Sequence, residues 1–261
     1  MIPMSIKSKR LRIGLLVLSV AALSLGAFTT ASANHSWGGY HWARTSNPFT
    51  LKIGDNVTAA WDSVLDTAIT DWTASAVLDM TKVAGLSNPK NCKATAGRVE
   101  VCNSKYGKNG WLGIASVWAT GGHISQGTVK LNDTYYSTPT YNTTAWRNLV
   151  MCQEIGHTIG LNHQDEDFNN ANLGTCMDYT NSPADNQHPN QHDFDQLVTI
   201  YTHLDTNTTV GQTTVNGNAA VDYDDQSTWG KAIRTDEKGR DIAFERNIGN
   251  QKVFTFVVWA E

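Results

Sequence analysis

The chain has 261 residues, of which 40% are hydrophobic and 17% charged, and its formal net charge is −4. This apolar content, which includes nine Trp, is sufficient for a buried core and excludes an intrinsically disordered chain. The balance is mildly acidic and no basic stripe follows any segment, so we expect no nucleic-acid partner.

The first thirty-three residues have the composition of a secretory signal peptide. Four basic residues between positions 7 and 12 precede an uncharged apolar run at 13–28, and Ala31-Ser32-Ala33 supplies small residues for cleavage. A membrane anchor is the alternative, because the length of the apolar run at 13–28 approaches the roughly 20 residues that a membrane span needs. No stop-transfer sequence follows, so we expect a secreted protein, extracellular or periplasmic, without a stable membrane anchor after cleavage.

The four cysteines lie beyond this segment, at positions 92, 102, 152 and 176. An even number in an exported chain predicts disulfides, and four cysteines allow three pairings. Cys92 and Cys102 are ten residues apart in the polar, Gly-punctuated stretch 88–110, so a local bond between them is the simplest interpretation. A cysteine zinc site is the alternative, but no Cys-x-x-Cys spacing is present.

The periodicity of apolar residues predicts an alternation of strands and helices. The expected elements are a strand at 49–53 ended by a turn at 54–56, a helix at 58–74, strands at 77–83, 111–118 and 126–132, helices at 144–159 and 193–203, and a hairpin of 243–246 with 253–259. This order is typical of an α+β protein.

Composition divides the mature chain into three parts. Residues 34–205 form the expected main domain, and 206–220 read as a linker rich in Thr, Asn and Gly. The remaining residues, 221–261, are too few for an independent core, so we expect a small β appendage that docks or stays loose.

One segment, CQEIGHTIGLNH, carries residues suited to metal chemistry. Gln153 and His157 are four residues apart and lie on one face of a helix. Gly160 is suited to end that helix in a left-handed conformation, which turns the chain back so that His163 reaches the same ion. Glu154 directly follows the first donor, Gln153, so we expect it to lie beside the metal without binding it.

This segment resembles the zinc motif of metzincin metalloproteases, His-Glu-x-x-His-x-x-Gly-x-x-His, most closely in the matrixin-like branch. The stretch 174–179, GTCMDY, is similar to their Met-turn, and the resemblance covers residues 49–205. It implies a twisted mixed sheet, an active-site helix, a Met-turn beneath the metal and a C-terminal helix. It also implies a zinc-dependent endopeptidase that acts on protein or peptide substrates, and we expect a monomer.

The resemblance assigns a role to each matching residue. It implies zinc ligands at Gln153, His157 and His163, a general base at Glu154, an oxyanion donor at Tyr179 and a structural methionine at Met177. It also brings Cys152 and Cys176 together beneath the metal, which implies a disulfide, with two buried thiols as the alternative. The strand at 112–118 is expected to offer its edge to an extended peptide.

Gln153 stands where the family has its first histidine, and three interpretations compete. The amide oxygen could ligate zinc, or the chain could have become a catalytically silent binding protein on a protease scaffold. In the third interpretation another side chain completes the site, with four candidates: His123, Asp178, His188 and His192.

Charge favours the first interpretation, because Gln and neutral His are both uncharged and leave the ion able to acidify water toward a pKa of about 7. Affinity is expected to fall, since an amide oxygen is a poorer zinc donor than imidazole. A silent site has no need of Glu154, so we predict an active site. The silent binding protein, and a metallohydrolase acting on non-peptide substrates, are the alternatives.

Two further groups receive structural interpretations. Asp165-Glu166-Asp167 are expected to form a solvated acidic loop, with a calcium site as the alternative. His35 and His41, in the aromatic stretch after the signal peptide, are expected to be surface or packing residues rather than ligands.

Overall fold

The computed structural model describes residue 1, residues 35–213 and residues 224–261. The expected signal peptide, apart from Met1, and residues 214–220 of the expected linker therefore lie outside the described residues. The described chain from His35 onward belongs to one compact unit. Within the described ranges, no helix combines the length and apolar character that a membrane span requires.

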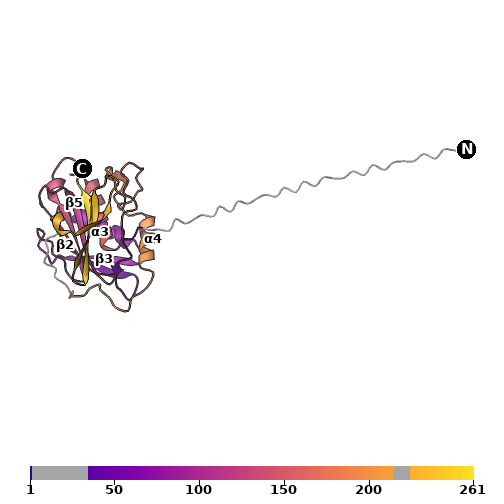
Figure 1. Ribbon diagram of the computed structural model, residues 1–261, viewed down its shortest axis with the longest axis horizontal. Coiled ribbons are helices and arrows are strands. Elements are labelled where there is room, and N and C mark those ends of the chain that lie inside the picture. The colour runs from indigo at the N-terminus through magenta and orange to yellow at the C-terminus, as the bar shows by residue number, and fades with distance from the viewer. Residues whose placement is uncertain (2–34, 214–223) are drawn as a thin grey trace. The chain divides into compact units, whose positions relative to one another are not determined.

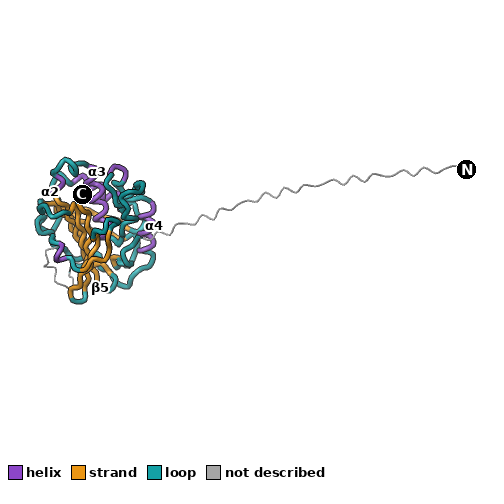
Figure 2. Tube along the Cα trace, turned by 45° about the horizontal axis from the view of Figure 1, so that its top comes forward, coloured by secondary structure: helices purple, strands orange, loops and turns teal. Residues whose placement is uncertain are grey.

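The described strands form one mixed sheet (Figures 1 and 2). Their bounds are β1 His41–Trp42, β2 Phe49–Asn56, β3 Leu78–Ala84, β4 Arg98–Ser104, β5 Trp111–Thr120, β6 His123–Asn132, β7 Lys231–Thr235, β8 Asp241–Ile248 and β9 Gln251–Trp259. The order across the sheet is β3-β2-β4-β6-β5-β9-β8-β7, and β1 pairs with β6. Pairs among β1, β2, β3, β4 and β6 are parallel, whereas β5 runs antiparallel to both β6 and β9.

The helices flank this sheet and include the expected active-site helix. Their bounds are α1 Asp62–Thr73, α2 Asp133–Tyr136, α3 Thr144–Thr158 and α4 Gln191–Ile200, with short 3-10 turns at Pro183–Asp185 and Gln226–Thr228. The side chain of Thr143 caps α3 by accepting the backbone N–H of Trp146. α3 packs on β5, β6, β9 and α1, which places one of its faces against the centre of the sheet.

Two expectations for the first half of the sheet are wrong. Gly54-Asp55-Asn56 is not a turn, because these residues continue β2 and pair with both β3 and β4. β4 lies inside the stretch 88–110, which was expected to be an irregular excursion. Its polar side chains are buried but paired: Arg98 Nε lies 2.9 Å from Glu100 Oε1, and Asn56 donates to the other carboxylate oxygen at 2.7 Å.

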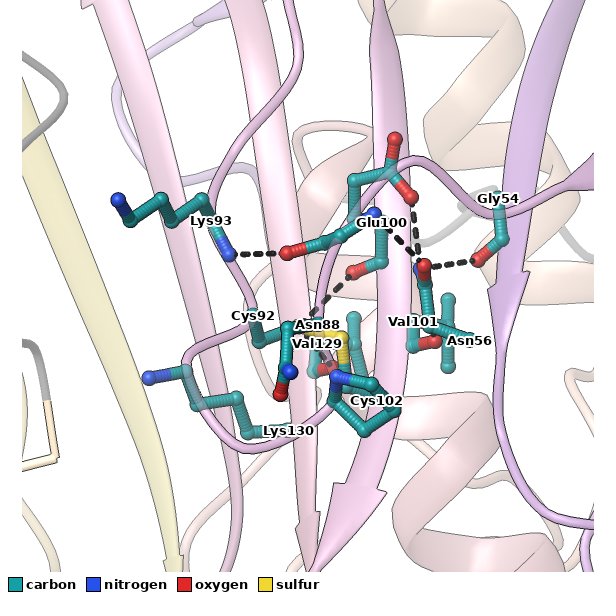
Figure 3. The surroundings of a disulfide bond; sticks show 12 residues. Gly54, Asn56, Asn88, Cys92, Lys93, Glu100, Val101, Cys102, Val129 and Lys130 are labelled. Carbon is teal, nitrogen blue, oxygen red and sulfur yellow. Dashed lines mark hydrogen bonds between the residues drawn. A yellow bond between two sulfur atoms is a disulfide. The ribbon is translucent and has the colours of Figure 1, made fainter.

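The disulfide expected between Cys92 and Cys102 is present and joins the preceding loop to β4 (Figure 3). Both cysteines are buried, and the figure places the bond beside Asn56 and Glu100. The loop is thereby held against a strand whose two charged side chains pair with each other.

The C-terminal hairpin forms as expected, but it is not an appendage. β8 and β9 pair in register from Ala243↔Phe256 to Ile248↔Gln251, and β9 then pairs along β5. Phe254, Phe256 and Val258 belong to the main hydrophobic core. A segment of about forty residues has too few apolar residues to form a core of its own. It buries the apolar residues that it has by adding strands to the main sheet.

Candidate metal centre

Two of the three expected metal-binding residues, His157 and His163, meet at the C-terminal end of α3. Gln153 and His157 lie on that helix and His163 follows it, all three buried. Gly160, at φ +102°, ends the helix in the left-handed region, and a Cβ there would lie 2.6 Å from the Tyr40 carbonyl oxygen. The turn that this glycine permits brings His157 Nε2 and His163 Nε2 to 3.1 Å from each other.

Each imidazole has an oxygen near its other nitrogen. His157 Nδ1 lies 2.8 Å from the Leu161 carbonyl oxygen, within hydrogen-bond distance, and His163 Nδ1 lies 3.6 Å from Glu166 Oε1, within ion-pair distance only. An Nδ1–H directed at an oxygen leaves Nε2 with its lone pair available, as in most histidine metal sites. Burial lowers the pKa of both histidines, and the neighbouring His163 lowers that of His157 further. The neutral form, which ligates metals, is therefore favoured.

Gln153 is held by its amide nitrogen. Its Nε2 donates to the Cys176 carbonyl oxygen at 2.9 Å, so the amide oxygen is the atom that remains for a metal. Gln153 also lines a hollow of about 10 Å³, near the room that one water needs, together with Asp178, Tyr179 and Val258. His157 and His163 are not part of this lining. By chemistry, one amide oxygen and two imidazole nitrogens are a donor set that zinc accepts.

Glu154, the expected general base, is 0% exposed. Neither carboxylate oxygen has a regular hydrogen bond among the described groups. Burial raises the pKa of Glu154 well above its usual range, and the backbone amides of Val258 and Ala115 offset this only in part. Gly113 makes room for the carboxylate, because a Cβ there would lie 2.8 Å from Glu154 Oε1.

Met177 packs beneath α3, as expected of a Met-turn residue. It is fully buried, and a Cβ on Gly156 would lie 2.5 Å from its Sδ and 2.9 Å from Trp72 Cζ2. The expected disulfide between Cys152 and Cys176 is also present and joins α3 to the residue before Met177. A glycine in the helix and a covalent link therefore hold the methionine against the metal-binding turn.

Replacing Gly156 with Ala is expected to lower the free energy of unfolding by about 1–3 kcal/mol, because the added methyl overpacks a filled site. This opposes the gain that Ala ordinarily brings to a helix. Urea unfolding measures the change. The same substitution in a Met177→Ala background should cost less, since the nearest atom is gone. An equal cost in both backgrounds would assign the strain elsewhere.

Tyr179 lies at the site but is engaged with the C-terminal strand. Its hydroxyl donates to the Val257 carbonyl oxygen at 2.9 Å, and its ring packs edge-on against His163 at 4.7 Å between centroids. Burial raises the pKa of its hydroxyl, so it remains a hydrogen-bond donor.

The expectation that residues 112–118 offer a free edge is wrong for this structure. β5 is paired with β6 on one side and with β9 on the other, from Trp111↔Trp259 to Ala119↔Lys252. The ring of Phe256, on β9, stacks on His157 at 4.3 Å and an interplanar angle of 13°. The C-terminal strand therefore occupies the edge and covers His157.

Three of the four alternative ligands considered for the third position contact groups elsewhere. His188 Nδ1 pairs with Asp71 at 2.7 Å, His192 stacks on His35, and His123 Nε2 lies 3.2 Å from Asp205. Asp178 differs: its Oδ2 accepts from the Leu173 backbone and the Asn186 amide, but its Oδ1 has no hydrogen-bond partner among the described groups. Asp178 also lines the hollow beside Gln153.

The remaining expected groups are also engaged within the chain. His35 is a buried packing residue, as expected, with Nε2 3.0 Å from Asp193. In the acidic loop, Asp165 and Asp167 accept backbone N–H groups two residues ahead, and Glu166 pairs with Arg234. These contacts occupy the carboxylates that a calcium site would use.

No family model matches the sequence, and no curated protein matches it. Six chains of solved structures match. One is high choriolytic enzyme 1, a hatching enzyme zinc-protease from the medaka fish Oryzias latipes, with 10% identity and a TM-score of 0.36 over 65% of this chain and 99% of that chain. A TM-score below 0.5 does not establish a common fold.

Proposed function

We propose that this chain is a secreted zinc-dependent endopeptidase of metzincin type, similar to the matrixin-like branch, with Gln153, His157 and His163 as metal ligands. The observation that carries the proposal is the 3.1 Å approach of the two Nε2 atoms at the end of the helix that also carries Glu154, whose carboxyl group is buried. Ligand bonds of about 2.0–2.1 Å place two nitrogens of a tetrahedral zinc site about 3.3 Å apart. The spacing in this chain is close to that value.

Each residue has a task in peptide hydrolysis. A bound zinc ion would polarise the scissile carbonyl and increase the acidity of a water molecule. Glu154 accepts the proton of the attacking water and delivers it to the leaving amine. Tyr179 donates to the oxygen that gains negative charge once its hydroxyl is free of Val257. Gln153 contributes no charge, so the total charge of the site matches that of a three-histidine site.

The C-terminal strand has to leave β5 before a peptide can bind. Glu154 and His157 are 0% exposed, so neither water nor substrate reaches them while β9 is in place. An extended peptide bound to β5 would make the strand-to-strand hydrogen bonds that β9 makes. We infer that β9 holds the substrate position in the closed state and that the active state has this edge open.

A catalytically silent binding protein is the second candidate, and two observations favour it. The base and His157 are covered by β9, and the first ligand position holds an amide that donates to Cys176. A silent protein would not hydrolyse an unfolded polypeptide in any state of β9. Hydrolysis therefore separates the two candidates.

Metal content tests the proposal first. The secreted form, residues 34–261, is expected to hold one zinc ion more per chain than the His157→Ala variant, because that substitution removes a ligand. Zinc is measured after purification without chelator. His188→Ala is the matched control, since His188 is an exposed histidine that pairs with Asp71 away from the site. Equal zinc content in His157→Ala and the native chain would overturn the assignment.

A further inference from the structure

A second group of metal-ligating side chains lies outside the site on α3. It consists of His41 in β1, His123 at the start of β6, and His203 and Asp205 after α4. β1 and β6 bring the first two together, because His41 and His123 are paired in register. We call these four residues the His–Asp cluster.

His41, His123 and Asp205 offer ligand atoms that all lie within 4.8 Å of one another, and His203 approaches two of these three residues. Oδ1 of Asp205 lies 3.5 Å from His41 Nε2, 3.2 Å from His123 Nε2 and 3.7 Å from His203 Nε2. The Nε2 atoms of His41 and His203 are 3.1 Å apart. Ligand bonds of about 2.0–2.2 Å place the atoms of a tetrahedral zinc site about 3.3–3.6 Å apart. The four distances fall around that range.

The groups behind the cluster orient it for metal binding. His41 Nδ1 lies 2.9 Å from the Gly39 carbonyl oxygen, which leaves its Nε2 as an acceptor. Oδ2 of Asp205 accepts from the backbone N–H and from Nη1 of Arg44, at 3.1 and 3.0 Å. The other oxygen, Oδ1, is thereby turned toward the three imidazoles. Arg44 is itself buried and donates to the Tyr201 carbonyl oxygen.

We propose that the His–Asp cluster is a second zinc site, in which His41, His123 and Asp205 bind the ion and the half-exposed His203 turns in as the fourth ligand. Four protein ligands complete a tetrahedron, which is the arrangement of structural rather than catalytic zinc. The ion joins three segments distant in sequence: β1, the start of β6, and the segment after α4. It therefore stabilises the fold and takes no part in hydrolysis.

Zinc titration of the His157→Ala variant tests this site, because the α3 site is already disabled there. We expect one zinc ion per chain and a rise in melting temperature on adding zinc chloride. Adding His203→Ala should weaken zinc binding by at least about 10–100-fold and remove the temperature rise. His203 is suited to this test because 54% of its side chain is exposed and it lies outside any helix or strand.

His188→Ala in the same background is the matched control, since its side chain is 56% exposed, and zinc binding should be unchanged. Adding His123→Asn in place of His203→Ala should weaken binding as well. If neither cluster variant changes the affinity for zinc, the four residues form only a hydrogen-bonded cluster and the proposal is overturned. Failure of the α3 site gives a different result: the native chain and His157→Ala then hold equal zinc, which His203→Ala removes.

Discussion

Replacing Glu154 with Gln is expected to lower kcat/KM for peptide hydrolysis by about 10²–10⁴-fold. The amide has nearly the shape of the carboxyl group and fits the space beside Gly113, but it cannot accept a proton from water. Hydrolysis of an unfolded protein or a fluorogenic peptide measures the loss. Zinc content and melting temperature should remain those of the native chain, which separates a lost base from a lost metal.

Glu100→Gln is the matched control, because Glu100 is likewise a fully buried glutamate but lies on β4 rather than on α3. It pairs with Arg98, so its neutralisation should lower stability by leaving a buried charge unpaired. Activity per folded molecule should be unchanged, since β4 contributes nothing to the site. Undiminished hydrolysis by Glu154→Gln would assign the base to another group and refute the proposed mechanism.

A disulfide that ties β9 to β5 is expected to abolish hydrolysis reversibly. Ser116 and Thr255 are register partners on these strands, and residues directly opposite in a sheet have Cβ atoms about 4.5–5.5 Å apart. The Ser116→Cys, Thr255→Cys double variant can therefore close a bond with modest adjustment. Oxidised, it keeps β9 on the edge that the substrate needs, and reduction should restore activity.

Ser116→Cys combined with Thr128→Cys is the matched control, because Thr128 is the partner of Ser116 on β6. That bond reinforces β5 without restraining β9, so activity should persist. The native chain is assayed in the same reductant to account for its own disulfides. Full activity of the oxidised β5–β9 variant would show that β9 is a permanent part of the site and that substrate enters elsewhere.

Local patterns predict much of the α3 site. The four-residue interval between Gln153 and His157 follows from helical geometry, and Gly160 supplies the turn that returns His163. The two disulfide pairs and the C-terminal hairpin are also those expected. Each depends on contacts between residues close in sequence or on a motif of known spacing.

β4 shows where such patterns do not suffice. Its sequence, RVEVCNS, contains a positive and a negative charge, which are unusual in a buried strand. Arg98 and Glu100 are tolerated because they pair with each other and because Asn56, more than forty positions earlier, donates to Glu100. These contacts depend on the pairing of β2 with β4. That pairing joins residues distant in sequence, so it cannot be predicted from any short stretch of the chain.

Helical periodicity and short-range turn geometry are enough to predict the α+β class and the turn that runs from His157 through Gly160 to His163. Only the tertiary structure decided that β9 lies on β5 and covers His157, since strand order depends on which edge best buries the apolar face. Tertiary structure alone also assembled the His–Asp cluster, whose members span positions 41 to 205. Isolated histidines carry no pattern, and only the pairing of β1 with β6 beside the segment after α4 brings His41 and His123 to Asp205.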